Sequence, residues 1–167
     1  MSLRLILTRH AKSSWSHGGL GDHERPLNQR GRNSADAIGD WLAAKGYLPE
    51  QALISSAART QETWARIAAR LPKAPAPEIL DSLYLAEPEE MLAILQQAKA
   101  GVVIMIAHNP GSARLAQGLA ARAPKHADFR RYPTAATTIF DFEAEDWPAL
   151  DRHRGRVVDF VIPRELI

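Results

Sequence analysis

The segment Val102-Val103-Ile104-Met105-Ile106-Ala107 is the most apolar run of the chain, and His108 follows it directly. Continuous apolar runs of this length are typical of strands that are covered on both faces of a sheet. Such strands occur mainly in parallel sheets that have helices on both sides. The segment therefore predicts an α/β fold, with His108 at the carboxyl end of a buried strand.

A second apolar run, at residues 3–8, is followed by Arg9 and His10. Open α/β sheets bind their ligands at the carboxyl ends of the strands. Two strands would thus bring His10 and His108 to the same edge of the sheet. The guanidinium group of Arg9 suits phosphate, because its planar fork can donate two hydrogen bonds to one anion. This combination predicts a phosphate-binding site.

The rest of the chain alternates between strand and helix patterns. Asn28 is expected to cap a helix that ends at Gly46. Asn109 and Pro110 predict a cap and a first-turn proline for another helix. Helices are expected at residues 29–45, 60–71, 88–99 and 110–122, and further strands at 52–56, 78–80, 134–142 and 156–162. The alternation predicts a three-layer α/β/α fold with a mostly parallel central sheet.

Length and composition limit the classes of protein. The chain has 167 residues, which predicts one domain spanning residues 1–167. It has no cysteine, so disulfides, thiolate metal sites and cysteine nucleophiles are excluded. No apolar run approaches the roughly 20 residues of a membrane span, and we expect a cytoplasmic protein with no membrane partner. The formal net charge of +2 is too small to indicate a nucleic-acid partner.

Arg59 is a third candidate for the site. It follows the expected strand at residues 52–56 and lies at the start of the next helix. A helix N-terminus and a guanidinium group both attract anions. Taken singly, Arg59 is an ordinary surface arginine, and His10 and His108 are ordinary structural histidines. Because the carboxyl ends of parallel strands meet at one edge, their expected convergence favours a functional site.

The loop after the first strand offers an alternative, a metal site. His17, Asp22 and His23 are residue types that bind metals. The glycines among residues 18–21 give this loop a flexible middle, and no further ligand follows at helical spacing. The same segment is not a phosphate-binding P-loop, because no Gly-Lys-Ser/Thr follows it. We therefore predict no metal.

Four blocks of sequence carry a family resemblance. They are Leu-Thr-Arg-His-Ala-Lys-Ser-Ser-Trp at 7–15, Arg-Pro-Leu-Asn-Gln-Arg-Gly at 25–31, Ser-Ser-Ala-Ala-Arg-Thr-Gln-Glu-Thr at 55–63 and Ile-Ala-His-Asn at 106–109. In this order they resemble the signatures of the histidine phosphatase superfamily, the phosphoglycerate-mutase-like proteins. The first block is most similar to the SixA-type protein phosphohistidine phosphatase branch. The resemblance implies a phosphoglycerate-mutase-like fold.

The resemblance also implies roles for four residues. His10 matches the family's nucleophile, which becomes transiently phosphorylated. Arg9 and Arg59 match the residues that clamp the phosphoryl oxygens, and His108 matches the residue that completes the catalytic pocket. Water then releases phosphate from His10. This scheme needs no metal and no other cofactor.

The sequence departs from the family pattern in ways that bear on the substrate. Many members have Gly and Glu where Ala11 and Lys12 stand, and Asn at the position of Ser16, whose hydroxyl we expect to donate one hydrogen bond to phosphate. No general acid is identified. The acids considered for that role are Asp22, Glu24, Asp81 and Glu87. An alkoxide leaves badly without a proton donor, whereas imidazole leaves as a neutral ring, so the missing acid favours a phosphohistidine substrate.

These observations predict a phosphatase that acts through a phosphohistidine intermediate on His10. Its expected partner is a phosphorylated protein, with a small phosphorylated substrate as the alternative. A phosphatase for small phosphoesters and a non-catalytic module that binds phospho-ligands remain open. Trp15 is expected either at the rim of the pocket or in the core.

Overall fold

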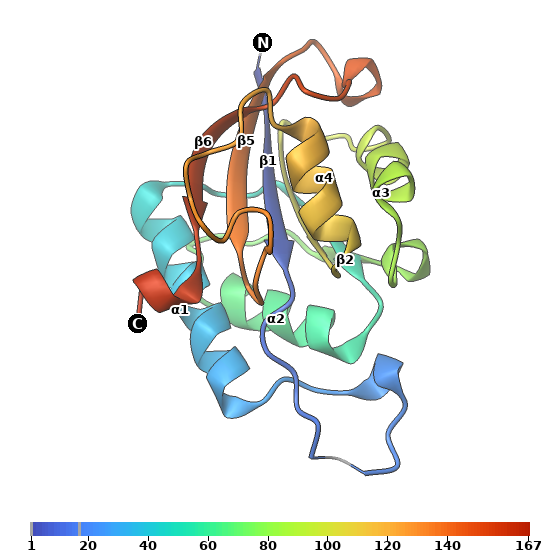
Figure 1. The fold of residues 1–167 in the computed structure, drawn as a ribbon, viewed down its shortest axis with the longest axis vertical. Coiled ribbons are helices and arrows are strands. Elements are labelled where there is room, and N and C mark those ends of the chain that lie inside the picture. The colour runs from blue at the N-terminus through green and yellow to red at the C-terminus, as the bar shows by residue number, and fades with distance from the viewer. Residues whose placement is uncertain (1, 17) are drawn as a thin grey trace.

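The computed structural model describes residues 2–16 and 18–167, and its central feature is one mixed sheet. The strands follow the order β3-β2-β4-β1-β5-β6 across the sheet (Figure 1). Their bounds are β1 Ser2–Arg9, β2 Gln51–Ser55, β3 Pro77–Leu80, β4 Val102–Ala107, β5 Thr137–Glu143 and β6 Arg156–Val161. The pairs β3–β2, β2–β4 and β4–β1 are parallel, whereas β5 runs antiparallel to both of its neighbours, β1 and β6. The predicted mostly parallel sheet is confirmed.

Helices cover both faces of this sheet and complete the three predicted layers. They are α1 Gln29–Lys45, α2 Ala58–Ala68, α3 Pro88–Leu95 and α4 Gly111–Leu119. Short 3-10 helices are η1 Asp22–Glu24, η2 Asp81–Leu83, η3 Trp147–Ala149 and η4 Pro163–Glu165. α1 and α2 share a buried apolar cluster with one face of the sheet, and α3 and α4 share a second cluster with the other face. No described helix is long and apolar enough to cross a membrane.

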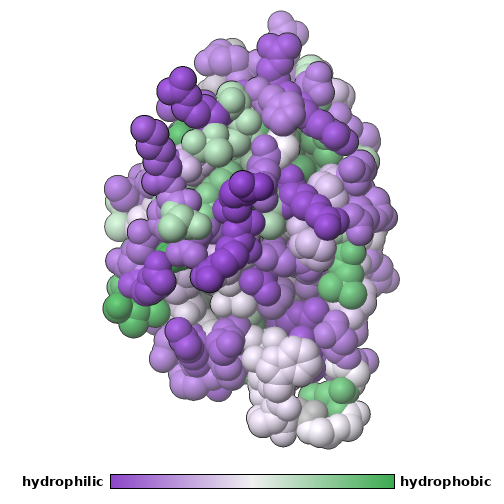
Figure 2. Space-filling view, in the orientation of Figure 1, coloured by the Kyte–Doolittle hydropathy of each residue, from purple (hydrophilic) through white to green (hydrophobic). Residues whose placement is uncertain are grey.

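The two clusters explain the uninterrupted apolar pattern of β4. Val103 and Met105 lie in the cluster with α3 and α4, whereas Ile104 and Ile106 lie in the cluster with α1 and α2. Successive side chains of a strand point to opposite faces of the sheet. Since both faces are covered, every position of this strand has to be apolar. On the outer face of the molecule seen in Figure 2, hydrophilic residues predominate and apolar spots are scattered.

Capping residues set both ends of α1 as predicted. The side chain of Asn28 accepts a hydrogen bond from the backbone amide of Gly31 over 2.8 Å. Gly46 ends the helix with a φ of 74°, in the left-handed region that glycine adopts without strain.

The ends of the other helices differ from the predictions. α2 ends at Ala68, three residues before the predicted end at residue 71, and α3 ends at Leu95 rather than at residue 99. Beyond α3, the side chain of Gln51 accepts hydrogen bonds from the amides of Lys99 and Ala100. These hydrogen bonds to a residue of β2 hold residues 99–100 in a non-helical conformation.

The region around α4 shows similar differences. Pro110 stands at the N-cap of α4 rather than in its first turn. The helix ends at Leu119, because Ala120 turns extended and forms a bridge with Gly155. β5 begins at Thr137 rather than at residue 134, after backbone at Ala135 with a φ of 61°. Tertiary pairing, which local sequence does not reveal, decides these boundaries.

Gly31 places α1 directly against the chain that follows β1. A Cβ atom at this position would overlap the backbone carbonyl oxygen of Lys12. The same carbonyl accepts a hydrogen bond from the amide of Asn28 over 3.0 Å. The glycine thus fixes the backbone two residues after His10.

We expect Gly31→Ala to lower the free energy of unfolding by about 1–3 kcal/mol, the usual cost of overpacking. Gly118→Ala is a matched control, since Gly118 lies in α4 and a methyl group added there would have no other atom within 4 Å. That change should raise stability by about 0.5–1 kcal/mol, because alanine is the better helix former. Urea unfolding of both variants measures the difference. A Gly31→Ala protein as stable as the native chain would contradict the contact.

Candidate active site

The parallel pairing of β1 and β4 brings His10 and His108 together. Arg9 is in register with Ala107, so each histidine is the next residue after a paired position. The amide of His10 donates to the carbonyl of Ala107 over 3.1 Å. The two imidazole rings are buried, with centroids 5.3 Å apart. The strand ends therefore place both rings at one edge of the sheet.

Arg9 and Arg59 lie at the same edge. Arg59 is in the first turn of α2, 3% exposed, with its Nη2 atom 3.3 Å from Nδ1 of His108. Arg9 donates from Nη1 to the carbonyl of Tyr132 over 3.2 Å. All four predicted residues line one hollow of about 280 Å³. The hollow is also lined by Lys12, Ser13, Trp15, Arg25, Leu85, Asn109 and Thr134.

A backbone contact sets the tautomer of His10. Its Nδ1 atom lies 2.7 Å from the carbonyl oxygen of Ala11, which can only accept a hydrogen bond. Nδ1 therefore carries the proton of the neutral ring, and Nε2 keeps its lone pair. Burial lowers the pKa of His10 to about 3, and the charges of Arg9 and Arg59 act in the same direction. At neutral pH the ring is uncharged, with a free lone pair on Nε2.

Two contacts also fix the orientation of His108. Its Nδ1 atom accepts from the guanidinium group of Arg59, so the proton of the neutral ring is on Nε2. Nε2 lies 2.7 Å from the hydroxyl of Ser55, at the end of β2. Burial lowers the pKa of His108 to about 3, with Arg59 the next cause, while Asp22 opposes the change. Both imidazoles are thus neutral before an anion enters.

Three guanidinium groups around the hollow have an unused donor. The Nε atoms of Arg9, Arg25 and Arg59 are buried and have no hydrogen-bond partner among the described residues. A buried donor left unpaired costs about 1–3 kcal/mol. All three arginines line the hollow that contains both histidines. A tetrahedral anion with several acceptor oxygens suits a hollow lined by three guanidinium groups.

Arg25 is a site residue that the sequence reasoning missed. It is buried, and its Nη1 atom donates to the hydroxyl of Ser13 and to the carbonyl of Ser14. Its guanidinium carbon lies 3.6 Å from the ring centroid of Trp15. Trp15 is 79% exposed, so it lies at the rim and not in the core. The one signal for Arg25 in the sequence was its place in the second block, since no strand or helix pattern positions it.

Asp22 links the loop after β1 to α2. Its carboxylate lies 3.0 Å from Arg25 and 3.0 Å from Arg59, and the hydroxyl of Tyr84 donates to it. The hydrogen bond from Tyr84, followed by those from the arginines, holds the pKa of Asp22 well below its usual range. Asp22 is therefore ionised at neutral pH, which suits an anchor for the arginines and not a proton donor. Glu24, Asp81 and Glu87, the other acids considered, do not line the hollow.

Tyr84 packs against His108 and is a second residue that the sequence analysis did not predict. Its ring meets the ring of His108 edge-on, with centroids 5.4 Å apart. It packs in the same way against His23, 4.8 Å away, whose Nε2 atom is 2.9 Å from the hydroxyl of Ser56. Tyr84 follows the short helix η2, so no periodic pattern in the sequence indicates its position.

Two sequence hypotheses concern the loop itself. Ser16 is exposed, its hydroxyl lies 2.8 Å from that of Ser14, and it does not line the hollow. Its contact with phosphate stays a prediction. Of the metal-site candidates, His17 lies outside the described residues, and Asp22 and His23 contact the partners given above. Within residues 2–16 and 18–167, no group of three His, Cys, Asp or Glu side chains could hold a metal ion.

Comparison with known sequences shows a similarity to one family over part of the chain. A sequence profile of the histidine phosphatase superfamily (branch 1) matches residues 5–83. This part of the chain is thus similar to the histidine phosphatase superfamily. An uncharacterized chloroplast protein of Arabidopsis thaliana is 48% identical over 63 residues, which are 38% of this chain and 29% of that protein. The chain thus matches less than a third of this plant relative.

Solved structures extend the likeness over nearly the whole chain. A protein assigned as SixA phosphohistidine phosphatase from Agrobacterium tumefaciens is 27% identical, with a TM-score of 0.78, and covers 96% of this chain and 98% of its own. Another, from Nakamurella multipartitia, is 24% identical, with a TM-score of 0.82, and covers 98% of this chain and 97% of its own. The phosphoglycerate-mutase-like fold expected from the four blocks is confirmed.

The lowered histidine pKa values predict how stability depends on pH. In the unfolded chain each histidine binds a proton near its ordinary pKa of 6.5, whereas His10 and His108 in the folded protein stay neutral down to about 3. Acid therefore favours unfolding. The stabilising contribution is full above about pH 6.5 and is lost as the pH falls toward 3. Between about pH 7 and pH 5 we expect a loss of about 2 kcal/mol for each histidine.

Urea unfolding at the two pH values measures this loss, and the double variant His10→Gln/His108→Gln should show much less of it. NMR gives a direct control, because the imidazole signals of His10 and His108 should keep their neutral positions down to about pH 5. A titration midpoint above that value for both rings would refute the assignment.

Proposed function

We propose that this protein is a phosphatase that forms a covalent phosphohistidine intermediate on His10 and acts on phosphohistidine-containing proteins. One arrangement carries the proposal. Nε2 of His10 has a free lone pair, and the ring lines a hollow together with the guanidinium groups of Arg9, Arg25 and Arg59. A nucleophile beside preorganised cations is what phosphoryl transfer requires. The similarity of residues 5–83 to the histidine phosphatase superfamily supports phosphatase activity.

In the first step, Nε2 of His10 forms a bond to phosphorus as the bond between phosphorus and the substrate nitrogen breaks. A substrate imidazole that is protonated on its other nitrogen leaves as a neutral ring. The phosphorylated ring of His10 carries a positive charge, and its Nδ1–H group still donates to the carbonyl of Ala11. That contact therefore stabilises the intermediate.

In the second step, a water oxygen bonds to phosphorus and the bond to Nε2 of His10 breaks. Both protons of the water stay with the product, which leaves as dihydrogen phosphate, and His10 returns to its neutral form. Arg9 and Arg59 hold the equatorial oxygens in both steps. Both arginines line the hollow before the reaction, so little reorganisation is needed.

His108 changes its protonation as the anion binds. Without an anion, the charges of Arg59 and Arg9 disfavour a proton on this ring. A phosphate dianion reverses that balance and favours the charged imidazole. Its Nδ1 atom would then become a donor to the phosphoryl group instead of an acceptor from Arg59. The two histidines therefore titrate as a coupled pair, with apparent pKa values that belong to the site.

The leaving group is the reason to favour phosphohistidine. Among the described residues that line the hollow there is no aspartate or glutamate. An alkoxide would have no carboxylic acid to protonate it, whereas imidazole needs none. The small-phosphoester alternative draws support from Trp15 and Leu85, exposed apolar side chains at the mouth that could contact an aromatic leaving group. Substrate comparison separates the two.

We expect kcat/KM to be higher for a phosphohistidine peptide than for an aryl phosphate, and lowest for a sugar phosphate. His10→Ala should lower turnover of all three by about a thousandfold or more, while inorganic phosphate still binds. His153→Asn, on the surface and outside the hollow, should leave turnover unchanged. Steady-state kinetics and trapping of phosphate on His10 by mass spectrometry test this. Preference for the sugar phosphate would refute the substrate, and native turnover without a phosphorylated His10 would refute the mechanism.

Arg59→Ala should both raise KM and lower kcat, with kcat/KM reduced by about a hundredfold or more. The reason is that a phosphoryl clamp acts on the bound substrate and on the transition state alike. Arg66→Ala is the matched control, because Arg66 lies on the same helix but pairs with Asp36 outside the hollow. It should change kcat/KM little. An unaltered kcat/KM in Arg59→Ala would rule out the clamp.

A further inference from the structure

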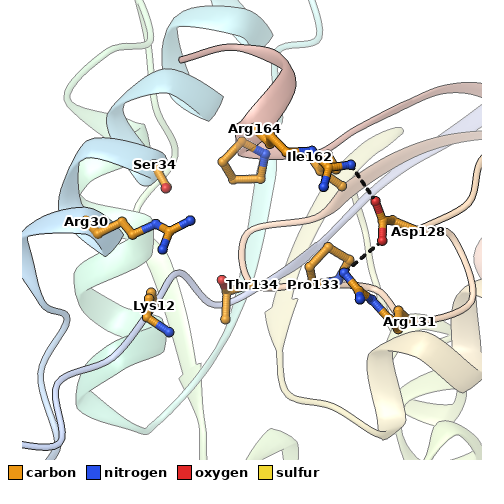
Figure 3. A pocket seen from close by; sticks show the side chains of 10 residues that line it. Lys12, Arg30, Ser34, Asp128, Arg131, Pro133, Thr134, Ile162 and Arg164 are labelled. Carbon is orange, nitrogen blue, oxygen red and sulfur yellow. Dashed lines mark hydrogen bonds and ion pairs between the residues drawn. The ribbon is translucent and has the colours of Figure 1, made fainter.

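A second hollow of about 200 Å³ adjoins the catalytic one. Lys12 and Thr134 line both, so the two hollows are neighbours. Figure 3 shows Lys12 and Arg30 on one side of Thr134, and Asp128 with Arg131 and Arg164 on the other. We call this the basic hollow, with Lys12, Arg30, Arg131 and Arg164 as its cations. A molecule with its phosphoryl group at His10 could extend into it.

The basic hollow has more positive than negative charge. Asp128 is its one carboxylate, and it is buried between Arg131 and Arg164, each 2.9 Å away. No carboxylate lies within 4.0 Å of the charged nitrogens of Lys12 or Arg30 among the described residues. The four cations and one anion leave three positive charges uncompensated beside the catalytic hollow.

The position of Arg30 points to a ligand rather than to helix stability. Arg30 lies in the first turn of α1, which contains no acidic residue. The helix dipole makes this end positive, so a cation there is unfavourable for the helix. An anion that docks between Arg30 and Lys12 would reverse this local repulsion. The positive charge of Arg30 in this turn is therefore better explained by recognition of an anion than by stabilisation of the helix.

The exposure of the cations indicates which anion they attract. The side chains of Arg131 and Arg164 are 74% and 75% exposed. Long, exposed cationic side chains attract several separate negative charges at long range. A compact phosphate is instead held by buried donors that converge on it, and these exposed side chains do not form such a set. The buried polar side chains of the hollow are Ser34 and Asp128. The carboxylate of Asp128 repels a phosphate dianion more strongly than a singly charged carboxylate. Carboxylates spread along a polypeptide fit this arrangement.

A nucleic acid fits less well. Single-stranded nucleic acids bind where aromatic side chains stack on the bases beside a basic groove. Among the described residues that line the basic hollow there is no aromatic side chain. We propose that the basic hollow docks acidic side chains that flank the phosphorylated residue of a protein substrate. This inference rests on the proposed function and specifies the class of protein substrate.

Two synthetic phosphohistidine peptides test the proposal. They have equal length, with glutamates around the phosphohistidine in one and glutamines at the same positions in the other. At low ionic strength we expect the native protein to show a kcat/KM about tenfold higher for the glutamate peptide, mainly through a lower KM. Salt near 0.2 M should reduce this preference to about twofold, because it screens exposed charges.

The double variant Arg30→Gln/Arg164→Gln should lose most of the preference and keep the native turnover of an aryl phosphate. Arg30→Lys retains the charge and should retain the preference. Arg122→Gln is the matched control, since Arg122 is exposed and lines neither hollow. Equal kcat/KM for the two peptides in the native protein, or an equal loss in Arg122→Gln, would overturn the proposal.

Binding of the unphosphorylated glutamate peptide, followed by fluorescence anisotropy, separates this inference from the proposed function. If the native protein hydrolyses neither phosphohistidine peptide but binds the glutamate peptide through Arg30, the docking surface stands and the substrate assignment fails. If it hydrolyses both equally well, the substrate assignment stands and the docking surface fails. A single-stranded oligonucleotide that binds through Arg30 more tightly than the glutamate peptide overturns the proposal in favour of nucleic acid.

Discussion

The parallel pairing of β1 with β4 sets the positions of the two histidines around which the candidate site is built. Its last register pair joins Arg9 to Ala107, and the next hydrogen bond runs from the amide of His10 to the carbonyl of Ala107. A shift of the register by one residue would turn one of the histidines to the other face of the sheet, since side chains alternate along a strand. The apolar layers on both faces oppose such a shift. Core packing therefore fixes the spacing of the two imidazoles.

Burial then determines the chemistry of these rings. Their removal from water, with guanidinium groups close by, keeps both neutral at physiological pH. The arginines also repel one another, and the pKa of Arg9 is lowered by burial and by the charge of Arg59. Asp22 offsets part of this repulsion through its pairs with Arg25 and Arg59. An anion in the hollow would offset the remaining repulsion among the arginines. The same crowding of positive charge therefore causes both this repulsion and the affinity of the site for an anion.

The sequence predicts those parts of the molecule that depend on local patterns. β4 coincides with the predicted apolar run, and the caps of α1 stand at Asn28 and Gly46, because these signals lie within a few residues of the structure they produce. Arg25, Asp22 and Tyr84 were not predicted as a connected group around the histidines. They come from a loop and from short 3-10 segments, which tertiary contacts place and no period reveals. The ends of α3 and α4 differ from the predictions for the same reason, as partners distant in sequence satisfy the backbone there.

Lys12 connects the catalytic hollow with the basic hollow. Many superfamily members resemble this chain in the first block but have glutamate at this position, and here the residue is a lysine that lines both hollows. A carboxylate at that point would repel both a phosphoryl group and any acidic segment next to it. A lysine attracts both. The contact of Gly31 with the backbone carbonyl of Lys12 holds the main chain at this point, so the exposed side chain projects from a fixed base. The lysine at this position is thus part of a positive surface that extends from the hollow with the two histidines to Arg30 and Arg164.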